Sequence, residues 1–354
     1  MAGRSASEIR QEFGITDVLK LASNENPLGP SPLAIEEMKK TFSDLHIYPN
    51  GGLDLREVLA ERFSLKLGNV IAGSGSEGIM SNIIRTFLCD DDEALTSEGT
   101  FVGFYVLARS RGIKMTMVPL RDYHIDLRAL AEAINEHTKI IYLANPNNPT
   151  GTIFTSAEFD AFMSRVPLNV LIILDEAYFE YAQANPVYPD SMHYRYDNVI
   201  TLRTFSKVYG LAGVRIGYGF AHDQLIGNLL KVKLPFEPST LAQAAAIGAL
   251  RDSAFLQHSL EVNRQGMAFL VPALEACGLR VIPSDANFVM VPMEDETEVT
   301  RLSGELLRAG IIIRPLAPFG LPHCIRITIG TPEQNRRFIG VLQTKLCGGH
   351  PAFS

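Results

Sequence analysis

The sequence predicts an α/β fold in which a mostly parallel central sheet is followed by a smaller αβ domain at the C-terminus. Strand-like and helix-like segments alternate from about residue 69 to residue 220. Unbroken apolar runs such as LIIL at 171–174 are what a parallel sheet buried on both faces requires. A helix-rich stretch follows, and the alternation then resumes at 280–329, which is typical of a second, smaller domain packed on the first.

The bulk composition excludes several classes of protein. The chain has 354 residues, 46% of them hydrophobic, and a net charge of −7 without a long basic run, which argues against nucleic-acid binding. No apolar run reaches the roughly 18 residues of a membrane span, and the N-terminus lacks the core of a signal peptide. The cysteines are scattered without a C-x-x-C pair, so we expect buried thiols, no metal site and a cytoplasmic location. They are Cys89, Cys277, Cys324 and Cys347.

The N-terminal part is expected to consist of helices separated by loops. The loop at 21–32, LASNENPLGPSP, is rich in Asn, Pro and Gly, which prevents regular structure. Asn24 in this loop offers hydrogen-bonding groups suited to a ligand, although a plain connector is the simpler interpretation. Tyr48, in the loop HIYPNGG, is on general grounds a packing residue. The expected helices span 5–20, closed by Gly14, and then 32–42 and 53–65.

A glycine turn between an expected strand and helix raises the possibility of a dinucleotide site. Gly73, Gly75 and Gly78 form a G-x-G-x-x-G pattern, which also requires an acidic residue at the end of the next strand, about 20 residues on. Here the acidic run 90–93 precedes the apolar segment ALTS, and this weakens the nicotinamide hypothesis. Ser76 and Glu77 instead begin a helix, whose free N-terminal amides can bind phosphate.

Polar residues follow the ends of three neighbouring buried strands. Asn148 follows the apolar run KIIYLA, and Asp175 and Tyr178 follow LIIL. Lys207 comes at the end of NVITLRTFSK, so all of these side chains are expected at the edge of the sheet where ligands bind. An unpaired aspartate in such a position is costly, so Asp175 is expected to meet a cation. A helix-capping aspartate is the simpler alternative.

The segment RTFSKVYGLAGVRIGYG, at 203–219, completes a chemical pattern. Lys207 follows two hydroxyl residues, Thr204 and Ser206, and Arg215 comes eight positions later. Alone, this segment reads as a solvated loop. Together with Asp175 and a phosphate-binding turn, it matches the demands of pyridoxal phosphate: a lysine for the Schiff base, a carboxylate for the pyridine nitrogen, and amides, hydroxyls and a cation for the phosphate.

With this set of residues, the chain resembles the fold-type I pyridoxal-phosphate aminotransferases and, within them, the histidinol-phosphate aminotransferases. The matching motifs are LASNENPLGPSP, YPNGG, GSGSEG, NPNNPTG, DEAYFEY, RTFSKVYGLAGVRIGYG, RPLAPFGLP and IRITIGT, which extend from about residue 20 to residue 331. The resemblance implies a three-layer large domain at 41–255 that binds the cofactor. It also implies a small C-terminal domain at 256–354, to which an N-terminal arm, 1–40, contributes.

The resemblance also implies a role for each site residue. Lys207 would form the internal aldimine and shuttle a proton, with Asp175 on the pyridinium nitrogen and Asn148 and Tyr178 on the ring hydroxyl oxygen. Phe101 would lie against the ring face, and Tyr48 would reach the phosphate of the neighbouring subunit, which implies a homodimer with shared active sites. The phosphate would be held by the amides of Ser76 and Glu77 together with Thr204, Ser206 and Arg215. The substrate would be bound by Arg314, Arg326 and Asn24.

The implied reaction is a ping-pong exchange of an amino group between histidinol phosphate and 2-oxoglutarate, in histidine biosynthesis. Aromatic aminotransferases and threonine-phosphate decarboxylases share the cofactor residues and remain alternatives, as do, more remotely, a nicotinamide-dependent dehydrogenase and a non-catalytic binding protein. The sequence departs from its relatives at Glu77, where aspartate is usual, and at Phe101, where tyrosine is common. The N-terminal AGRS also lacks the relatives' tyrosine segment, which bears on substrate identity more than on reaction type.

Overall fold

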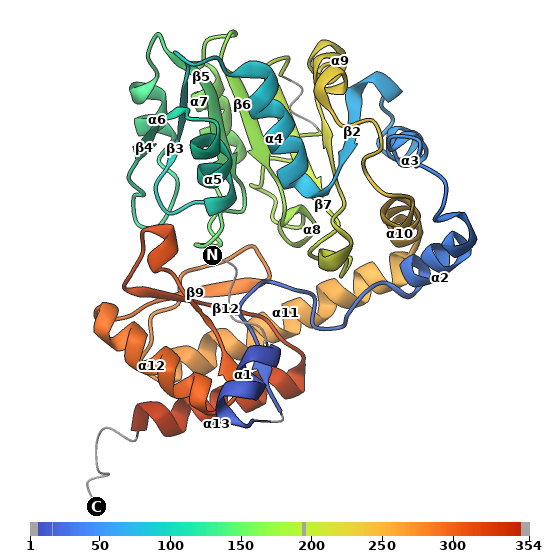
Figure 1. Cartoon of the computed structure of the whole chain (residues 1–354). Helices are drawn as coiled ribbons and strands as arrows, with labels where there is room; N and C mark the ends of the chain where they lie inside the picture. Colours follow the sequence, from blue (N-terminus) through green and yellow to red (C-terminus); the bar gives the residue numbers. More distant parts are fainter. Residues whose placement is uncertain (1–5, 16, 193–195, 348–354) are drawn as a thin grey trace, which may run out of the picture.

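The computed structural model describes residues 6–15, 17–192 and 196–347. These residues form a larger part, built around a seven-stranded sheet, and a smaller part below it in Figure 1. The long helix α11 (Ser253–Ala276) runs between the two parts. The N-terminal AGRS segment lies outside the described residues.

The large sheet is mostly parallel, as predicted. Its strand order is β2-β8-β7-β6-β5-β3-β4, and β8 runs antiparallel to both of its neighbours while the other pairings are parallel. The strands are β2 (Val70–Gly73), β3 (Glu93–Ser97), β4 (Lys114–Val118), β5 (Thr138–Ala144), β6 (Leu171–Asp175), β7 (Val199–Thr204) and β8 (Gly217–Phe220).

Helices cover both faces of this sheet, which confirms the three-layer prediction. Apolar side chains of α4, α5 and α9 pack on one face, and those of α6 and α7 pack on the other. At the β2–β8 end, α2, α3 and α10 enclose a further core. The helices of this part are α2 (Pro32–Lys40), α3 (Leu53–Arg62), α4 (Gly75–Phe87), α5 (Val102–Ser110), α6 (Leu127–Ala133), α7 (Ser156–Met163), α8 (Phe179–Ala182), α9 (Asp223–Val232) and α10 (Thr240–Arg251), with short 3₁₀ turns at Phe42–Asp44, Leu67–Asn69 and Ala212–Val214.

The smaller part has its own sheet and core. Three antiparallel strands in the order β11-β12-β9 pack with α11, α12 and α13, and β1 pairs in parallel with β10. Helix α13 was not predicted from the sequence. The elements are α1 (Ala6–Phe13), β1 (Leu19–Lys20), β9 (Phe288–Pro292), α12 (Glu296–Arg308), β10 (Ile311–Ile312), β11 (Arg314–Pro315), a 3₁₀ turn (Ala317–Phe319), β12 (Cys324–Thr328) and α13 (Pro332–Cys347).

The N-terminal segment contacts both parts. Leu19 pairs with Ile311 in the smaller part, whereas α2 packs on α10 of the larger part. The boundaries predicted at residues 40 and 255 therefore stay predictions. Several local expectations were wrong. The helix expected over 5–20 ends at Phe13, and Leu19–Lys20 form strand β1, while Cys277 is only partly buried. Cys89 is exposed instead of buried, because it lies in the turn after α4, and Glu93 begins β3 instead of ending the preceding turn, its buried carboxylate pairing with Lys114 at 2.7 Å.

Candidate active site

The carboxyl ends of β5, β6 and β7 open onto a cavity of about 210 Å³. Asp175 is the last residue of β6 and Thr204 is the last residue of β7, and both side chains line this cavity. Because side chains alternate along a strand, the preceding residues point to the other face. Most of the residues singled out in the sequence line it, although they come from five separate segments. The predicted residues in its wall are Ser76, Glu77, Phe101, Asn148, Asp175, Tyr178, Thr204, Ser206, Lys207 and Arg215.

Asp175 is a buried carboxylate held by two hydrogen bonds. The hydroxyl of Tyr142 donates to Oδ2 at 2.8 Å, and the backbone N–H of Ala177 donates to Oδ1 at 3.2 Å. Burial raises the pKa of Asp175 to about 6, while these hydrogen bonds and the charge of Lys207 act in the opposite direction. The expected cation is thus present in the same pocket, but no direct ion pair joins Asp175 to it. Tyr142 was missed because it lies inside the apolar run of β5.

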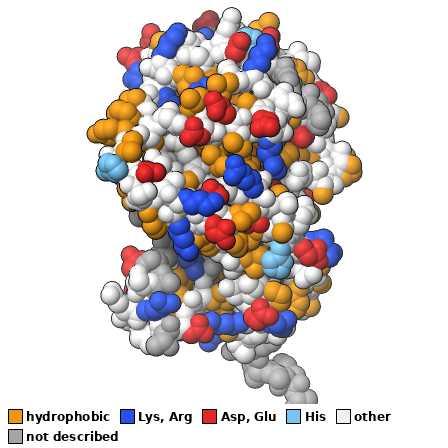
Figure 2. Space-filling view, turned by 90° about the vertical axis from the view of Figure 1, so that its right-hand side faces the viewer, with side chains coloured by type: hydrophobic (Ala, Val, Ile, Leu, Met, Phe, Trp, Pro, Cys, Tyr) orange, Lys and Arg blue, Asp and Glu red, His pale blue; other side chains and the backbone are white. Residues whose placement is uncertain are grey.

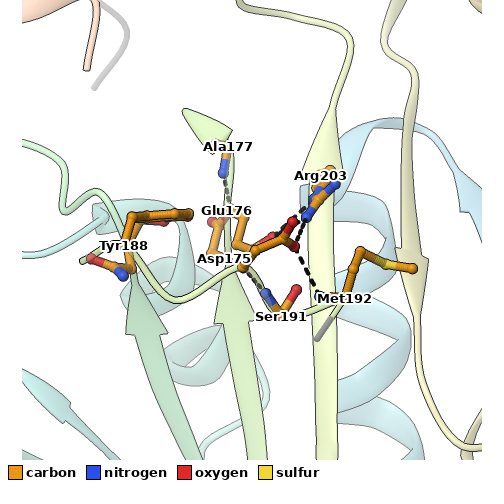
Figure 3. Close-up of polar contacts among 9 residues, drawn as sticks. Asp175, Glu176, Ala177, Tyr188, Ser191, Met192 and Arg203 are labelled. Carbon is orange, nitrogen blue, oxygen red and sulfur yellow. Dashed lines mark hydrogen bonds and ion pairs between the residues drawn. The ribbon is translucent and has the colours of Figure 1, made fainter. Parts of the chain in front are cut away.

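A buried charge cluster lies on the other side of the β6 end (Figure 3). Arg203 and Glu176 form an ion pair at 2.8 Å, with both side chains almost completely buried. The Arg203 guanidinium also contacts Asp190 at 3.1 Å and lies 3.3 Å from the ring centroid of Phe179. Because Glu176 follows Asp175 and Arg203 precedes Thr204, this pair ties together the two strand ends that supply the pocket residues.

Lys207 reaches the pocket from the segment that follows β7. Among the described residues, its ammonium has no hydrogen bond or ion pair, and it lies 5.5 Å from the ring centroid of Tyr178. A lysine placed in this way, beside a buried carboxylate, is free to react with a carbonyl group.

An anion-binding cradle adjoins Lys207. The helix α4 begins at Gly75, and its N-cap Ser74 makes no side-chain capping bond, which leaves the first amides free. Arg215 Nη1 donates to Ser206 Oγ at 3.4 Å, and Thr204 Oγ1 is 3.0 Å from the same oxygen. A Cβ atom at Gly217 would lie 2.5 Å from the amide nitrogen of Ser76, so this close approach requires glycine.

Two arginines form a second cationic site on the smaller part. Arg314 and Arg326 stand directly opposite each other in the pairing of β11 with β12. Arg326 is buried: it bonds Asn148 Oδ1 and donates to the carbonyl of Ala22 at 3.0 Å, while its Nε has no partner. Burial, with a contribution from the like charge of Arg314, lowers the pKa of Arg326 to about 10. Like charges placed opposite each other are unfavourable unless an anion lies between them.

The last two predicted residues lie outside the cavity wall. Asn24 is buried and donates from Nδ2 to the Tyr178 hydroxyl at 2.8 Å. Tyr48 is 76% exposed and stacks on Phe236 with ring centroids 4.2 Å apart, away from the pocket. Tyr48 therefore does not line the pocket of its own chain.

A nicotinamide site finds little support in the described part of the chain. The glycine turn at 73–78 forms one wall of the cradle. Glu98 follows the carboxyl end of β3, but β3 is separated from β2 in the sheet by β8, β7, β6 and β5, so this carboxylate does not stand beside the glycine turn as a nicotinamide site requires. The described residues contain no group of three potential metal ligands, and none of their helices is long and apolar enough to cross a membrane.

Comparison with known proteins identifies the family. Residues 16–342 match the family described as aminotransferase class I and II. The chain belongs to this family. It is 42% identical to a histidinol-phosphate aminotransferase of Moorella thermoacetica, over 96% of this chain and 89% of the relative. It is 43% identical to one of Brevibacillus brevis, over 98% of this chain and 95% of the relative. The resemblance drawn from the sequence motifs is thus confirmed.

Solved structures agree with this assignment. A histidinol-phosphate aminotransferase of Sinorhizobium meliloti, crystallised with pyridoxal 5′-phosphate, matches with a TM-score of 0.91 and 28% identity, covering 99% of this chain and 96% of that one. An L-threonine-O-3-phosphate decarboxylase of Porphyromonas gingivalis matches with a TM-score of 0.81 over 93% of this chain and 99% of that one. At 22% identity, this likeness concerns the fold alone.

The pocket of this aminotransferase fits pyridoxal phosphate. Lys207 makes no hydrogen bond or ion pair among the described residues and suits the cofactor's aldehyde. The buried carboxylate of Asp175 suits the ring nitrogen, and the amides beside Arg215 suit the phosphate. Phe101 supplies an apolar surface in the same wall.

Proposed function

We propose that this aminotransferase exchanges an amino group between histidinol phosphate and 2-oxoglutarate, giving imidazole acetol phosphate and glutamate, in cytoplasmic histidine biosynthesis. The observation that carries the proposal is the presence of two separate anion sites around one lysine. The cradle beside Arg215 suits the phosphate of the cofactor, and the pair Arg314–Arg326 suits a substrate anion. The identity to histidinol-phosphate aminotransferases over nearly the whole chain supports this choice of substrate.

Each residue of the pocket has a part in this reaction. Pyridoxal phosphate, when bound, supplies the electron sink that makes the substrate's α-proton acidic. Asp175 would hold the proton on the ring nitrogen, and Asn148 and Tyr178 would contact the ring hydroxyl oxygen. Lys207 would hold the cofactor and carry the proton from the substrate's α-carbon. Phe101 would exclude water from one face of the ring.

The phosphate cradle anchors the cofactor while Lys207 is occupied by the proton transfer. The Ser76 and Glu77 amides would donate to the phosphate, as would the hydroxyls of Thr204 and Ser206. Arg215 adds a positive charge, and its ion pair with the Glu77 carboxylate at 3.0 Å orients the guanidinium. Because both side chains of that pair are about half exposed, it contributes orientation more than stability.

The arginine pair explains how one site could serve two substrates in turn. Glutamate presents carboxylates, whereas histidinol phosphate presents a phosphate, and guanidinium groups bind both kinds of anion. Asn148 Oδ1 bonds Arg326 and therefore links the cofactor end of the pocket to the substrate end.

The proposed enzyme is a homodimer with shared active sites. Exposed apolar side chains concentrate in the loops around α2 and α3 and in the segment after α9, on the side that faces the viewer in Figure 2. Tyr48 and Phe236 stack within this surface, and Lys233 ties their two loops together by donating to the carbonyl of Gly51 at 3.0 Å. A rigid, exposed aromatic pair suits insertion into a second copy of the chain, whose phosphate site Tyr48 would reach. The surface members are Phe42, Leu45, Ile47, Tyr48, Leu53, Val232, Leu234 and Phe236.

A spectral titration tests the function. The protein is reconstituted with pyridoxal phosphate and mixed with histidinol phosphate, and 2-oxoglutarate is then added. We expect the absorption of the amino form of the cofactor to appear and then to revert. If histidinol phosphate left the spectrum unchanged while phenylalanine or tyrosine altered it, the enzyme would be an aromatic aminotransferase. Release of carbon dioxide from threonine phosphate would identify a decarboxylase, and failure to take up the cofactor would refute the proposal.

A further inference from the structure

Asn24 is fixed by the smaller part of the molecule. Its backbone N–H donates to Thr328 Oγ1 at 3.0 Å, and its carbonyl accepts from Asn287 Nδ2 at 3.1 Å. Thr328 ends β12, two residues beyond Arg326, and Asn287 precedes β9. Asn24 has a φ of 57°, a conformation that asparagine tolerates better than most residues, and its side chain is buried.

The carboxamide of Asn24 has both polar atoms occupied. The Thr328 hydroxyl donates to Oδ1 at 3.1 Å, which leaves Nδ2 as the donor to the Tyr178 hydroxyl at 2.8 Å. Although Nδ2 has a second N–H, Asn24 is only 1% exposed and does not line the cavity, so this geometry gives no support to the direct contact with the substrate that the sequence led us to expect. The geometry points instead to an indirect role.

The bond from Asn24 determines where the proton of Tyr178 goes. A phenol hydroxyl has one proton, and its oxygen accepts the bond from Asn24, so the proton must point elsewhere. The Tyr178 ring is held against Phe288 at 5.2 Å and lines the cavity together with Asn148 and Lys207. No other hydrogen bond of this hydroxyl occurs in the described parts of the chain, so the cavity is the direction left for its proton.

We infer that Asn24 is a positioning residue, which directs the Tyr178 proton into the pocket and ties that hydroxyl to the strand carrying Arg326. The inference rests on the proposed function for the identity of the acceptor, the ring hydroxyl oxygen of pyridoxal phosphate. Arg326 binds the substrate anion in that proposal and lies on the same face of β12 as Thr328. A displacement of β12 on substrate binding would therefore reach Tyr178 through the bonds of Thr328 and Asn24.

The test measures the midpoint pH of the change in cofactor absorption in the holoenzyme, which is the pH at which half of the cofactor has lost its proton. Without a donor from Tyr178, the ring oxygen keeps more negative charge and holds the neighbouring proton of the cofactor more tightly. We therefore expect Tyr178→Phe and Asn24→Ala each to raise the midpoint, by about one pH unit, which is the size of one hydrogen bond to a charged group. The double variant is expected to shift no further than Tyr178→Phe alone, because both changes remove the same bond.

Two conservative variants distinguish an effect on the direction of the Tyr178 proton from a general loosening of the Tyr178 side chain. Asn24→Asp offers only acceptors, so the Tyr178 proton would turn away from the pocket, and we expect a shift at least as large as that of Asn24→Ala. Thr328→Val removes the hydroxyl that orients the carboxamide, and a shift in the same direction is expected. Asn335→Ala is the matched control: it removes two buried hydrogen bonds at 2.9 Å to Gly330 and none to Asn24, Thr328 or Tyr178, so it should lower the unfolding temperature while leaving the midpoint unchanged.

Different results would overturn the role of Asn24 and the proposed function. A wild-type midpoint in Asn24→Ala or in Asn24→Asp, with a shifted midpoint in Tyr178→Phe, overturns the role of Asn24 and leaves the proposed function intact. Additive shifts in the double variant overturn it as well. A wild-type midpoint in Thr328→Val overturns the link to β12. Failure of the wild-type protein to develop the band with pyridoxal phosphate overturns both proposals.

Discussion

Replacing Asp175 by asparagine is expected to make the cofactor-free protein more stable at neutral pH. Burial raises the pKa of this carboxyl to about 6 in the folded state, against 3.8 for an exposed aspartate. Between these values the folded state binds a proton that the unfolded state has lost, so the free energy of unfolding falls as the pH rises from about 4 to 6. The full difference corresponds to about 3 kcal/mol.

Asparagine has the shape of aspartic acid and can keep both contacts of the carboxyl group. Its Oδ1 can accept from the Ala177 N–H, and its Nδ2 can donate to the Tyr142 hydroxyl oxygen, so the variant resembles the protonated side chain at every pH. With pyridoxal phosphate the order reverses, because the ring nitrogen loses its negative partner. Asp175→Asn is therefore expected to release the cofactor faster than the wild type.

Urea unfolding of the two cofactor-free proteins, at one protein concentration and at several pH values from 4 to 7.5, measures the effect. We expect the difference in unfolding free energy to be small at pH 4 and to grow to about 3 kcal/mol in favour of Asp175→Asn at pH 7. Parallel pH profiles for the two proteins, or a variant less stable at pH 7, would show that the burial of this charge does not cost stability.

The remaining predictions concern the lysine, the substrate site and the cradle. Lys207→Ala should abolish transamination in a coupled assay and leave the far-ultraviolet circular dichroism unchanged, since the ammonium has no protein partner among the described residues; substantial residual turnover would refute the assignment. Arg326→Ala should raise the KM of both substrates by about 100-fold, as the loss of a charged hydrogen bond implies, and an effect on only one substrate would contradict a shared site. Gly217→Ala places a methyl group 2.5 Å from Ser76 N and should weaken cofactor affinity about tenfold in a fluorescence titration, whereas Gly213→Ala, with open space around it, should not.

Most of the elements could be predicted because their patterns are local. The apolar run before Asp175 and the glycine turn before α4 each lie within one short segment, and the motif around Lys207 does as well. A contact between two strands is different, because it depends on their register. Arg203 and Glu176 lie 27 residues apart, and only the pairing of β6 with β7 shows that they meet. Tyr142 was missed because an aromatic residue in an apolar strand looks like a core residue, and its bond to Asp175 joins two different strands.

The substrate end of the site was predicted from its residues but not from its geometry. The spacing of Arg314 and Arg326 says nothing of their position directly across an antiparallel ladder, and that position makes the pair suited to an anion. The bond from Asn24 to Tyr178 spans 154 residues and crosses from one part of the molecule to the other. No local pattern carries such a contact, so the motif alone suggested direct substrate binding where the structure favours positioning.

At the ends of β6 and β7, a buried carboxylate with no ion pair among the described residues lies next to a buried ion pair. Asp175 faces the pocket as a buried charge that pairs fully only with a ligand, whereas Glu176, on the other side, is already neutralised by Arg203. A buried ion pair of this kind adds little net stability, but breaking it by removing one partner costs about 3–5 kcal/mol. Its contribution is therefore to exclude other alignments of the two strand ends. This holds Asp175 and Thr204 at a fixed separation before any ligand enters, as the ring nitrogen and the phosphate of one rigid cofactor require.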